Sequence, residues 1–273
     1  MLRVGAVSYL NTKPLIYGLR ERMGGAGRLQ LNLPSRLAED LSAGKLDVAL
    51  IPSVEYFRGP RQNRHDGYKI VSDAVIACRG PVWSVRLLSR VPVPQIKRLA
   101  LDEGSRTSAA MLKVLLHEIH SLSPETIPLG IEQTPDTVDA DAILLIGDRA
   151  MHPERGVYQE IWDLGDRWCR WTEKPFVFAM WVARRGLDTD ELAEMLQASR
   201  DDGLANLDRI SAEEAAGHGL TNEDLLSYFV DNLHFQLGPG ERLGLETFRQ
   251  RAASLGLIPP HQDVSTHSLS NLT

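Results

Sequence analysis

The sequence predicts an α/β protein of two lobes, in which mixed sheets flanked by helices enclose a ligand cleft between the lobes. Short β-branched or apolar runs alternate with amphipathic segments, a pattern typical of mostly parallel sheets. The length of 273 residues is large for one core and fits two domains of roughly 100–150 residues. Two extended runs, 83–89 and 176–183, could carry the chain between the lobes, and two crossings would form a hinge around a cleft.

The first part of the chain predicts five strands and two helices. The strands are β-branched or apolar runs: Leu2–Val7, Leu29–Leu33, Asp47–Ile51, Tyr68–Cys78 and Val82–Ser89. Helical spacing predicts one helix over Leu15–Arg22. A second helix would run from Ser35, which can cap its N-terminus, to Leu41, with Gly44 as its stop.

A second set of elements follows the proline-rich segment Val91–Pro94. Its strands are predicted at Leu99–Asp102, Glu125–Leu129 and Ala142–Ile146. A helix is predicted from Ser108 to His120, because four apolar positions share one face: Leu112, Leu115, Leu116 and Ile119. The pattern from Asp188 onward is helical, and Thr221 with Asp224 resembles a capping box.

These elements predict the division of the chain into lobes. The first lobe is discontinuous, the second is continuous, and a polar tail is expected to be disordered: 1–88 plus 182–260, 89–181, and 261–273. In open α/β sheets, ligands lie beyond the carboxyl ends of the strands. That rule places four loops at the cleft, those after Val7, Ile51, Asp102 and Ile146.

Composition narrows the class of ligand. The formal net charge of −6 argues against nucleic acid or an anionic membrane as a partner. Cys78 and Cys169 form no disulfide framework, and the sequence shows neither a signal-peptide pattern nor a long apolar run, so a cytoplasmic location is expected. Metal-binding and nucleotide-binding motifs are missing. We therefore expect a small-molecule ligand, with no cofactor and no metal; the oligomeric state is not indicated.

The first two loops each allow two interpretations. The first carries Tyr9, Leu10 and Asn11. Asn11 can exchange hydrogen bonds with a ligand, or it can cap the following helix. In the second loop Ser53 can cap a helix, or the N–H groups near Ser53 and Val54 can bind an anion.

The third loop carries the strongest chemical signal. Ser105, Arg106, Thr107 and Ser108 gather three hydroxyls, a guanidinium and the start of a long helix, a combination that suits a carboxylate. The alternative is a capped helix with a surface arginine.

The fourth loop begins at a glycine. Gly147 permits close approach of backbone, and Asp148 can accept a substrate hydroxyl or cap the next helix. Both interpretations of Asp148 stay open.

Five ordered segments carry a resemblance to a known family: Val4–Leu15, Leu46–Ser53, Arg79–Val85, Asp102–Ser108 and Pro175–Ala179. Together they are similar to the chorismate dehydratase family of the futalosine route to menaquinone. The resemblance extends from residue 1 to about residue 256 and implies a type II periplasmic-binding-protein-like fold. That architecture has the same two crossings and the same cleft between lobes.

The resemblance also implies a reaction. Chorismate, a dianion, loses water to give 3-[(1-carboxyvinyl)oxy]benzoate, and aromatisation drives the elimination without a cofactor. Asn11 and Ser84 match the family's active-site residues, and the resemblance implies that Ser105, Thr107 and Ser108 hold a carboxylate. Because no loop carries an evident general base, the substrate's own enolpyruvyl carboxylate is expected to take the proton. Phe176, in the fifth segment, is a further expected substrate contact.

Two alternatives remain open. The sister dihydroxynaphthoate synthase shares the fold, but it begins with a Ser-Pro-Cys-Pro-Asn-type loop and uses a catalytic histidine, and neither feature is found in this sequence. The second alternative is a non-catalytic binding protein for a small carboxylated ligand. Turnover of chorismate separates that class from the enzymes.

Overall fold

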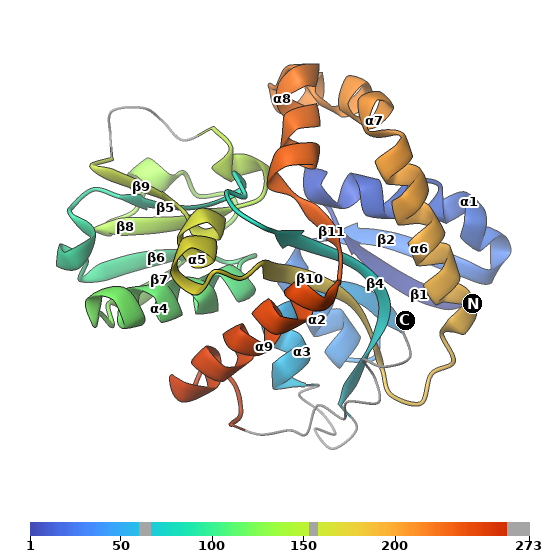
Figure 1. Ribbon diagram of the computed structural model, residues 1–273, viewed down its shortest axis with the longest axis horizontal. Coiled ribbons are helices and arrows are strands. Elements are labelled where there is room, and N and C mark those ends of the chain that lie inside the picture. The colour runs from blue at the N-terminus through green and yellow to red at the C-terminus, as the bar shows by residue number, and fades with distance from the viewer. Residues whose placement is uncertain (60–66, 153–157, 261–273) are drawn as a thin grey trace.

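Two mixed β-sheets with helices packed around them organise the chain in the computed structural model (Figure 1), which describes residues 1–59, 67–152 and 158–260. The predicted α/β fold class is confirmed. The five-stranded sheet lies towards one end of the long axis, and the six-stranded sheet forms the centre of the larger part (Figure 1). The tail 261–273, predicted to be disordered, lies outside the described residues.

The six-stranded sheet has the order β11-β4-β10-β3-β1-β2. Its strands are β1 Leu2–Val7, β2 Gly27–Asn32, β3 Val48–Pro52, β4 Tyr68–Cys78, β10 Phe176–Arg184 and β11 His234–Gln236. Strand β1 pairs in parallel with β2 and β3. Strand β10 runs antiparallel between β3 and β4, so a late segment of the chain joins two early strands into one sheet.

The five-stranded sheet has the order β7-β6-β8-β5-β9. Its strands are β5 Val85–Ser89, β6 Arg98–Asp102, β7 Glu125–Leu129, β8 Ala142–Ile146 and β9 Glu160–Asp163. Strand β6 pairs in parallel with β7 and β8, whereas β5 is antiparallel to β8 and β9. The carboxyl ends of β6 and β8 therefore meet at one edge, as the loop rule requires.

The chain passes between the sheets twice. It leaves the first sheet after β4 and enters the second at β5, and it returns from β9 through α5 (Leu164–Thr172) to β10. The two runs expected to cross between the lobes, 83–89 and 176–183, thus contain β5 and β10. These segments are strands within the sheets, because extended backbone needs hydrogen-bond partners on neighbouring strands. The predicted division into 1–88 plus 182–260 and 89–181 stays a prediction.

Prolines and a glycine set helix boundaries that spacing alone did not predict. The helix expected over Leu15–Arg22 is instead a 3₁₀ helix, Leu10–Ile16, followed by α1, Leu19–Met23. Gly18, with φ of 64°, separates the two, since the left-handed region interrupts helical backbone. Helix α2, Pro34–Ser42, begins with Pro34 in its first turn, so the predicted cap at Ser35 was wrong.

The remaining helices surround the two sheets. They are α3 Ser53–Arg58, α4 Thr107–His120, α6 Asp190–Ala205, α7 Leu207–Glu214, α8 Asn222–Ser227 and α9 Pro239–Ser254. The predicted capping box is confirmed: the Asp224 N–H donates to Thr221 Oγ1 over 3.1 Å and the Asp224 carboxylate accepts in return. Directly after α8 the backbone widens into one π-helical turn, Tyr228–Asn232. None of the described helices is long and apolar enough to span a membrane.

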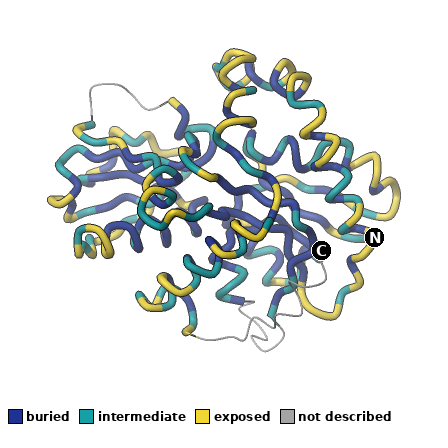
Figure 2. Tube along the Cα trace, viewed as in Figure 1, coloured by how far each residue is buried: buried dark blue, intermediate teal, exposed yellow. Residues whose placement is uncertain are grey.

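The core lies along the sheets. Figure 2 shows buried strands at the centre and exposed residues mainly on the outer faces of helices and in loops. Helix α4 buries Leu112, Leu115 and Leu116 as predicted, whereas Ile119, near its end, is 42% exposed. An aromatic cluster of Trp168, Phe176 and Phe248 packs α5 and α9 against β10, with centroids 5.0–5.9 Å apart.

Candidate active site

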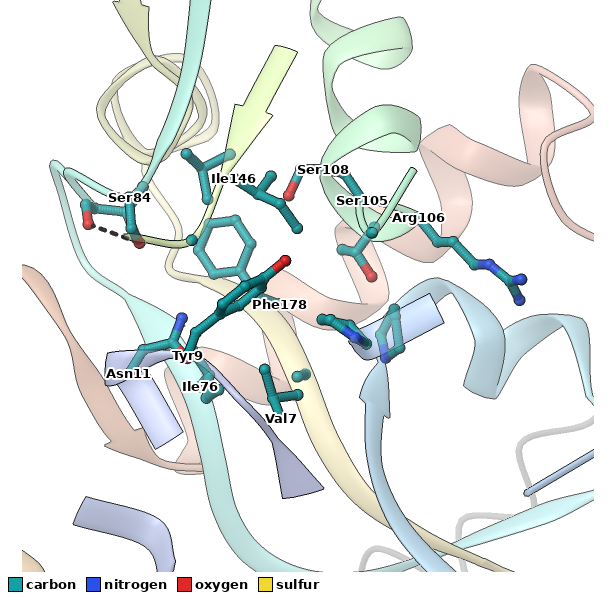
Figure 3. A pocket seen from close by; sticks show the side chains of 18 residues that line it. Val7, Tyr9, Asn11, Ile76, Ser84, Ser105, Arg106, Ser108, Ile146 and Phe178 are labelled. Carbon is teal, nitrogen blue, oxygen red and sulfur yellow. Dashed lines mark hydrogen bonds between the residues drawn. The ribbon is translucent and has the colours of Figure 1, made fainter. Parts of the chain in front are cut away.

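A cavity lies where the loops after β1, β6 and β8 come together with the β4–β5 crossing (Figure 3). Eight of the residues predicted for the site line it: Tyr9, Asn11, Ser84, Ser105, Arg106, Thr107, Ser108 and Gly147. The order of the strands thus brings Tyr9 and Asn11 into one cavity with Gly147, which lies far later in the sequence.

Apolar side chains form much of the wall, and sequence reasoning missed them. They include Val7, Ile76, Val82, Ile146 and Phe178. Val7 and Ile146 end predicted strands, so the rule that ligands lie beyond strand ends could have identified them. Phe178 and Ile76 come from strands that sequence alone does not pair.

The start of α4 presents unpaired donors to the cavity. The N–H groups of Thr107, Ser108 and Ala109 have no acceptor among the described residues, and Arg106 at the N-cap makes no side-chain capping bond. Ser105 Oγ is buried and has no hydrogen-bond partner in the described chain. A helix N-terminus with open donors favours an anion.

The Arg106 guanidinium does not point at the cavity. It lies 2.5 Å from a Glu39 carboxylate oxygen and 3.2 Å from one of Glu55. Figure 3 shows the side chain running away from Tyr9. Two carboxylates thus hold the Arg106 guanidinium in this structure, and its contact with a substrate carboxylate stays a prediction.

Thr107 also uses its side chain elsewhere. Its Oγ1 accepts a hydrogen bond from the Val54 N–H over 3.2 Å and lies 3.4 Å from Ser53 Oγ. Ser53 in turn donates to the Val177 carbonyl over 2.7 Å. Ser53 and Val54 are buried outside the cavity lining, so the second predicted loop fastens α3 to α4 and contributes only Pro52 to the wall.

Tyr9 reaches across the cavity from the first sheet to the second. Its ring lies so close to Gly147 that a Cβ there would be 2.9 Å from ring atoms, and Gly147 has φ of 67°. The Tyr9 hydroxyl is buried without a hydrogen-bond partner in the described chain. Burial, with Asp102 and Asp148 nearby, raises the pKa of Tyr9, so the phenol stays neutral and can donate.

Leu10 and Asp148 lie beside the cavity and do not line it. The Leu10 N–H donates to Asp148 Oδ1 over 3.1 Å, and His218 Nε2 lies 3.5 Å from the other oxygen. Burial raises the pKa of Asp148. Asp148 thus binds the opening loop. The next helix has Gly147 at its N-cap, so the capping interpretation of Asp148 was wrong, whereas its contact with a substrate hydroxyl stays a prediction.

Phe176 was expected to contact substrate, but the structure places it in the aromatic core with Phe248 and Trp168. Phe178, two residues along β10, lines the cavity instead. The two rings pack 4.8 Å apart. The register shift between Val177 and Ala179 gives β10 an irregularity at this point, which an alternation rule cannot predict.

Asn11 and Ser84 face the cavity from different segments. The helix beginning at Leu10 has Tyr9 at its N-cap and no side-chain capping bond, so the capping interpretation of Asn11 was wrong. Thr12 Oγ1 donates to Asn11 Oδ1 over 3.3 Å. Ser84 follows Trp83, whose φ is 62°, and Ser84 Oγ accepts from the Tyr228 hydroxyl over 2.8 Å.

The described lining residues include no carboxylate and no imidazole. Asp102, outside the lining, accepts the Gly104 N–H over 2.9 Å and lies 3.3 Å from Arg149, while burial raises its pKa. The described residues also hold no cluster of three or more His, Cys, Asp or Glu side chains. The arrangement can therefore bind and polarise an anion, but its lining offers no general base.

Comparison with known proteins decides the family. The chain matches the menaquinone biosynthesis family over residues 2–254. It belongs to that family. Chorismate dehydratase from Thermus thermophilus is 31% identical over 273 aligned residues, which cover 93% of this chain and 95% of that protein. The family resemblance drawn from the five segments is confirmed.

Solved structures support the fold of this family member. A protein from Archaeoglobus fulgidus superposes with a TM-score of 0.76 at 16% identity, covering 94% of this chain and 98% of that one. A Candida albicans protein described as having the generic periplasmic binding protein fold gives a TM-score of 0.62 at 10% identity, covering 100% and 95%. The expected periplasmic-binding-protein-like fold is confirmed.

Proposed function

We propose that this member of the menaquinone biosynthesis family is a chorismate dehydratase, which converts chorismate into 3-[(1-carboxyvinyl)oxy]benzoate. The nearly full-length similarity to the Thermus thermophilus enzyme supports this activity. The cavity supports it independently, since its donors suit carboxylates and its walls suit a six-membered ring. A cytoplasmic location, expected from the sequence, is part of the proposal.

One observation carries the proposal: buried donors without partners converge on one end of the cavity. Ser105 Oγ and the Tyr9 hydroxyl have no hydrogen-bond partner in the described chain, and the first N–H groups of α4 are open beside them. Buried polar groups are normally satisfied, so orphaned donors at a cavity indicate a missing ligand oxygen. A carboxylate of the dianionic substrate would satisfy them together.

The elimination balances without an oxidant. The C–H bond at the ether-bearing ring carbon and the C–O bond to the neighbouring hydroxyl break, and the electron pair of the former becomes the third double bond of the ring. The proton and the hydroxyl leave as one water. The gain of aromaticity supplies the driving force, and the protein has to lower the barrier.

The proton acceptor is the substrate itself in this proposal. Since the described lining has no carboxylate or imidazole, we assign proton removal to the enolpyruvyl carboxylate, which the ether oxygen holds near the ring. Asn11 and Ser84 would orient the ring and the leaving hydroxyl. The protein then contributes orientation and fixed dipoles, which act strongly in a site shielded from water.

The apolar wall has a defined part in this scheme. Phe178, Ile146 and Val82 line the cavity and would pack against the ring while it becomes planar. They also keep water from the reacting carbons, so dipoles from Ser84 and α4 act in a medium of low dielectric.

The test is turnover without additions. Purified protein is incubated with chorismate in buffer containing a chelator, and the products are followed by proton NMR and mass spectrometry. We expect the ring-hydrogen signals of a meta-substituted benzoate and the loss of one water. Chorismate that binds, as detected by calorimetry, yet persists would contradict the proposal and favour the non-catalytic binding protein.

A further inference from the structure

A buried hydroxyl behind the cavity connects the two residues proposed to act on the substrate. We infer that Tyr228 is a positioning residue that orients the Asn11 amide and the Ser84 hydroxyl for the elimination, an inference that rests on the proposed function. Tyr228 is fully buried and does not itself line the cavity. It can act on the substrate only through the groups it holds.

The hydrogen bonds around Tyr228 have a defined direction. Its hydroxyl donates to Ser84 Oγ over 2.8 Å, and the Asn11 side chain lies close enough to the same hydroxyl to oppose the rise in its pKa. Burial raises the pKa of Tyr228, so the phenol keeps its proton and remains the donor to Ser84. In this order Tyr228 is the donor and Ser84 the acceptor.

This order leaves the Ser84 proton available. A serine hydroxyl has one donor and two acceptor positions, and Tyr228 fills an acceptor position. The one contact that Ser84 Oγ can donate to within the described chain is the Val82 carbonyl at 3.4 Å, which is long for an O–H···O bond. A substrate oxygen in the cavity is a better acceptor, and a hydroxyl that accepts one hydrogen bond donates a second more strongly.

Contacts of the neighbouring residue Trp83 fix the backbone on which Ser84 lies. Trp83 has φ of 62°, which is unusual for a non-glycine residue. Its N–H donates to Asp163 over 2.6 Å, and its ring meets the Tyr228 ring edge to face at 5.6 Å. The strained residue is thus fixed from both sides, and strain that is held in this way is typical of functional sites.

The π-helical turn that carries Tyr228 is fastened to the same crossing. Asn232, at the end of the turn, donates from Nδ2 to the Pro81 carbonyl over 3.0 Å. The turn therefore contacts the crossing at Pro81, Trp83 and Ser84. Such π-helical turns often occur at functional sites, and this one places a tyrosine hydroxyl within reach of two segments far apart in sequence.

Tyr228→Phe removes the hydroxyl and leaves the ring. We expect kcat for chorismate to fall by about tenfold, because one buried hydrogen bond is lost from the reacting arrangement, while KM changes by less than about twofold. Tyr56→Phe is the matched control, since it removes the hydroxyl of another largely buried tyrosine that does not line the cavity, and it should leave both constants unchanged.

A double-mutant cycle tests whether Tyr228 acts through Ser84. In a Ser84→Ala background, Tyr228→Phe should reduce kcat by a clearly smaller factor than in the wild type, because one of its partners is gone. An equal factor in both backgrounds, or a wild-type kcat in folded Tyr228→Phe, overturns the inference while leaving the proposed function intact. A wild-type protein that leaves chorismate unchanged overturns both.

Fluorinated tyrosines at position 228 provide a series that keeps the ring and the hydroxyl, so folding is preserved. Fluorine makes the phenol a stronger donor in graded steps. We expect kcat to change monotonically with the acidity of the free phenol while KM stays constant. A flat series would show that the Tyr228 hydroxyl serves only packing, and the inference would be wrong.

Discussion

At the scale of single residues, the contact between Tyr9 and Gly147 closes the cavity between the sheets. The two residues follow β1 and β8, which belong to different sheets. Gly147 has both a positive φ and no room for a Cβ, so two independent constraints favour glycine. The need for a glycine could be read from sequence as a site of close approach, but its partner Tyr9 could not, because the contact spans 138 positions between the sheets.

Gly147→Ala should displace the Tyr9 ring as well as strain the backbone. We expect a loss of about 1–3 kcal/mol in the free energy of unfolding and a KM for chorismate raised by about tenfold, measured by chemical denaturation and initial rates. Gly186→Ala is the control, because Gly186 also has a positive φ, 87°, but no atoms within 4 Å of the added Cβ. Equal effects of both substitutions on KM would contradict the role given to Tyr9.

At the scale of elements, the start of α4 is the main feature proposed to bind an anion. The strand β6 and the helix were both predicted within a few residues of their observed bounds, and so were the hydroxyls between them. The sequence could not predict which of these hydroxyls would be hydrogen-bonded within the protein: Thr107 accepts from the Val54 N–H, whereas Ser105 has no partner in the described chain. Ser105 and Thr107 both carry hydroxyls, but they differ in their hydrogen bonds, because only Thr107 has a partner on the facing helix α3.

Ser105→Ala removes one of the orphaned donors. We expect the affinity for chorismate to fall by about threefold to tenfold, the value of one hydrogen bond, with thermal stability unchanged or higher because a buried unpaired hydroxyl is lost. Calorimetry at reduced temperature and thermal unfolding measure the two effects. Ser199→Ala, on α6, removes another buried unpartnered hydroxyl far from the cavity and should leave affinity unchanged; a matching loss of affinity would refute the assignment.

At the scale of the whole molecule, polar contacts connect the loops and helices around the two sheets beside the cavity. Asp148 binds the Leu10 N–H, and Arg106 binds Glu39 and Glu55. The α/β class and most of the strands and longer helices could be predicted, because the apolar runs are clear, whereas the order of the strands within each sheet could not. These contacts between sheets, like those of Tyr228, could not be predicted, because they depend on the way two separately built sheets meet.

Asp148→Asn keeps an oxygen for the Leu10 N–H and removes a partly buried charge. Because burial raises the folded-state pKa of Asp148, protonation favours the folded wild type, and the cost of the charge exists only at higher pH. The variant should therefore have a higher Tm than the wild type at about pH 8, with the difference shrinking towards about pH 3. A difference that is constant across this range would contradict the assignment.

Asp224→Asn is the control, because its effect on stability is expected to have the opposite sign. Hydrogen bonds from Thr221 lower the pKa of Asp224, so its contribution to stability is present at neutral pH and is lost as pH falls through the folded-state pKa. This variant should be less stable than the wild type at about pH 8 and should converge with it in acid.

The position of β10 between β3 and β4 has a consequence for synthesis on the ribosome. Among the described strands, β4 pairs only with β10 and β11, which emerge about 100 or more residues later. The strands β5 to β9 are contiguous in sequence and can assemble first, while β4 waits with its apolar face uncovered. A nascent chain of this kind is an aggregation hazard, so the second sheet is expected to mature before the first. The cavity, which Phe178 and Ala179 help to line, can form only after β10 has emerged.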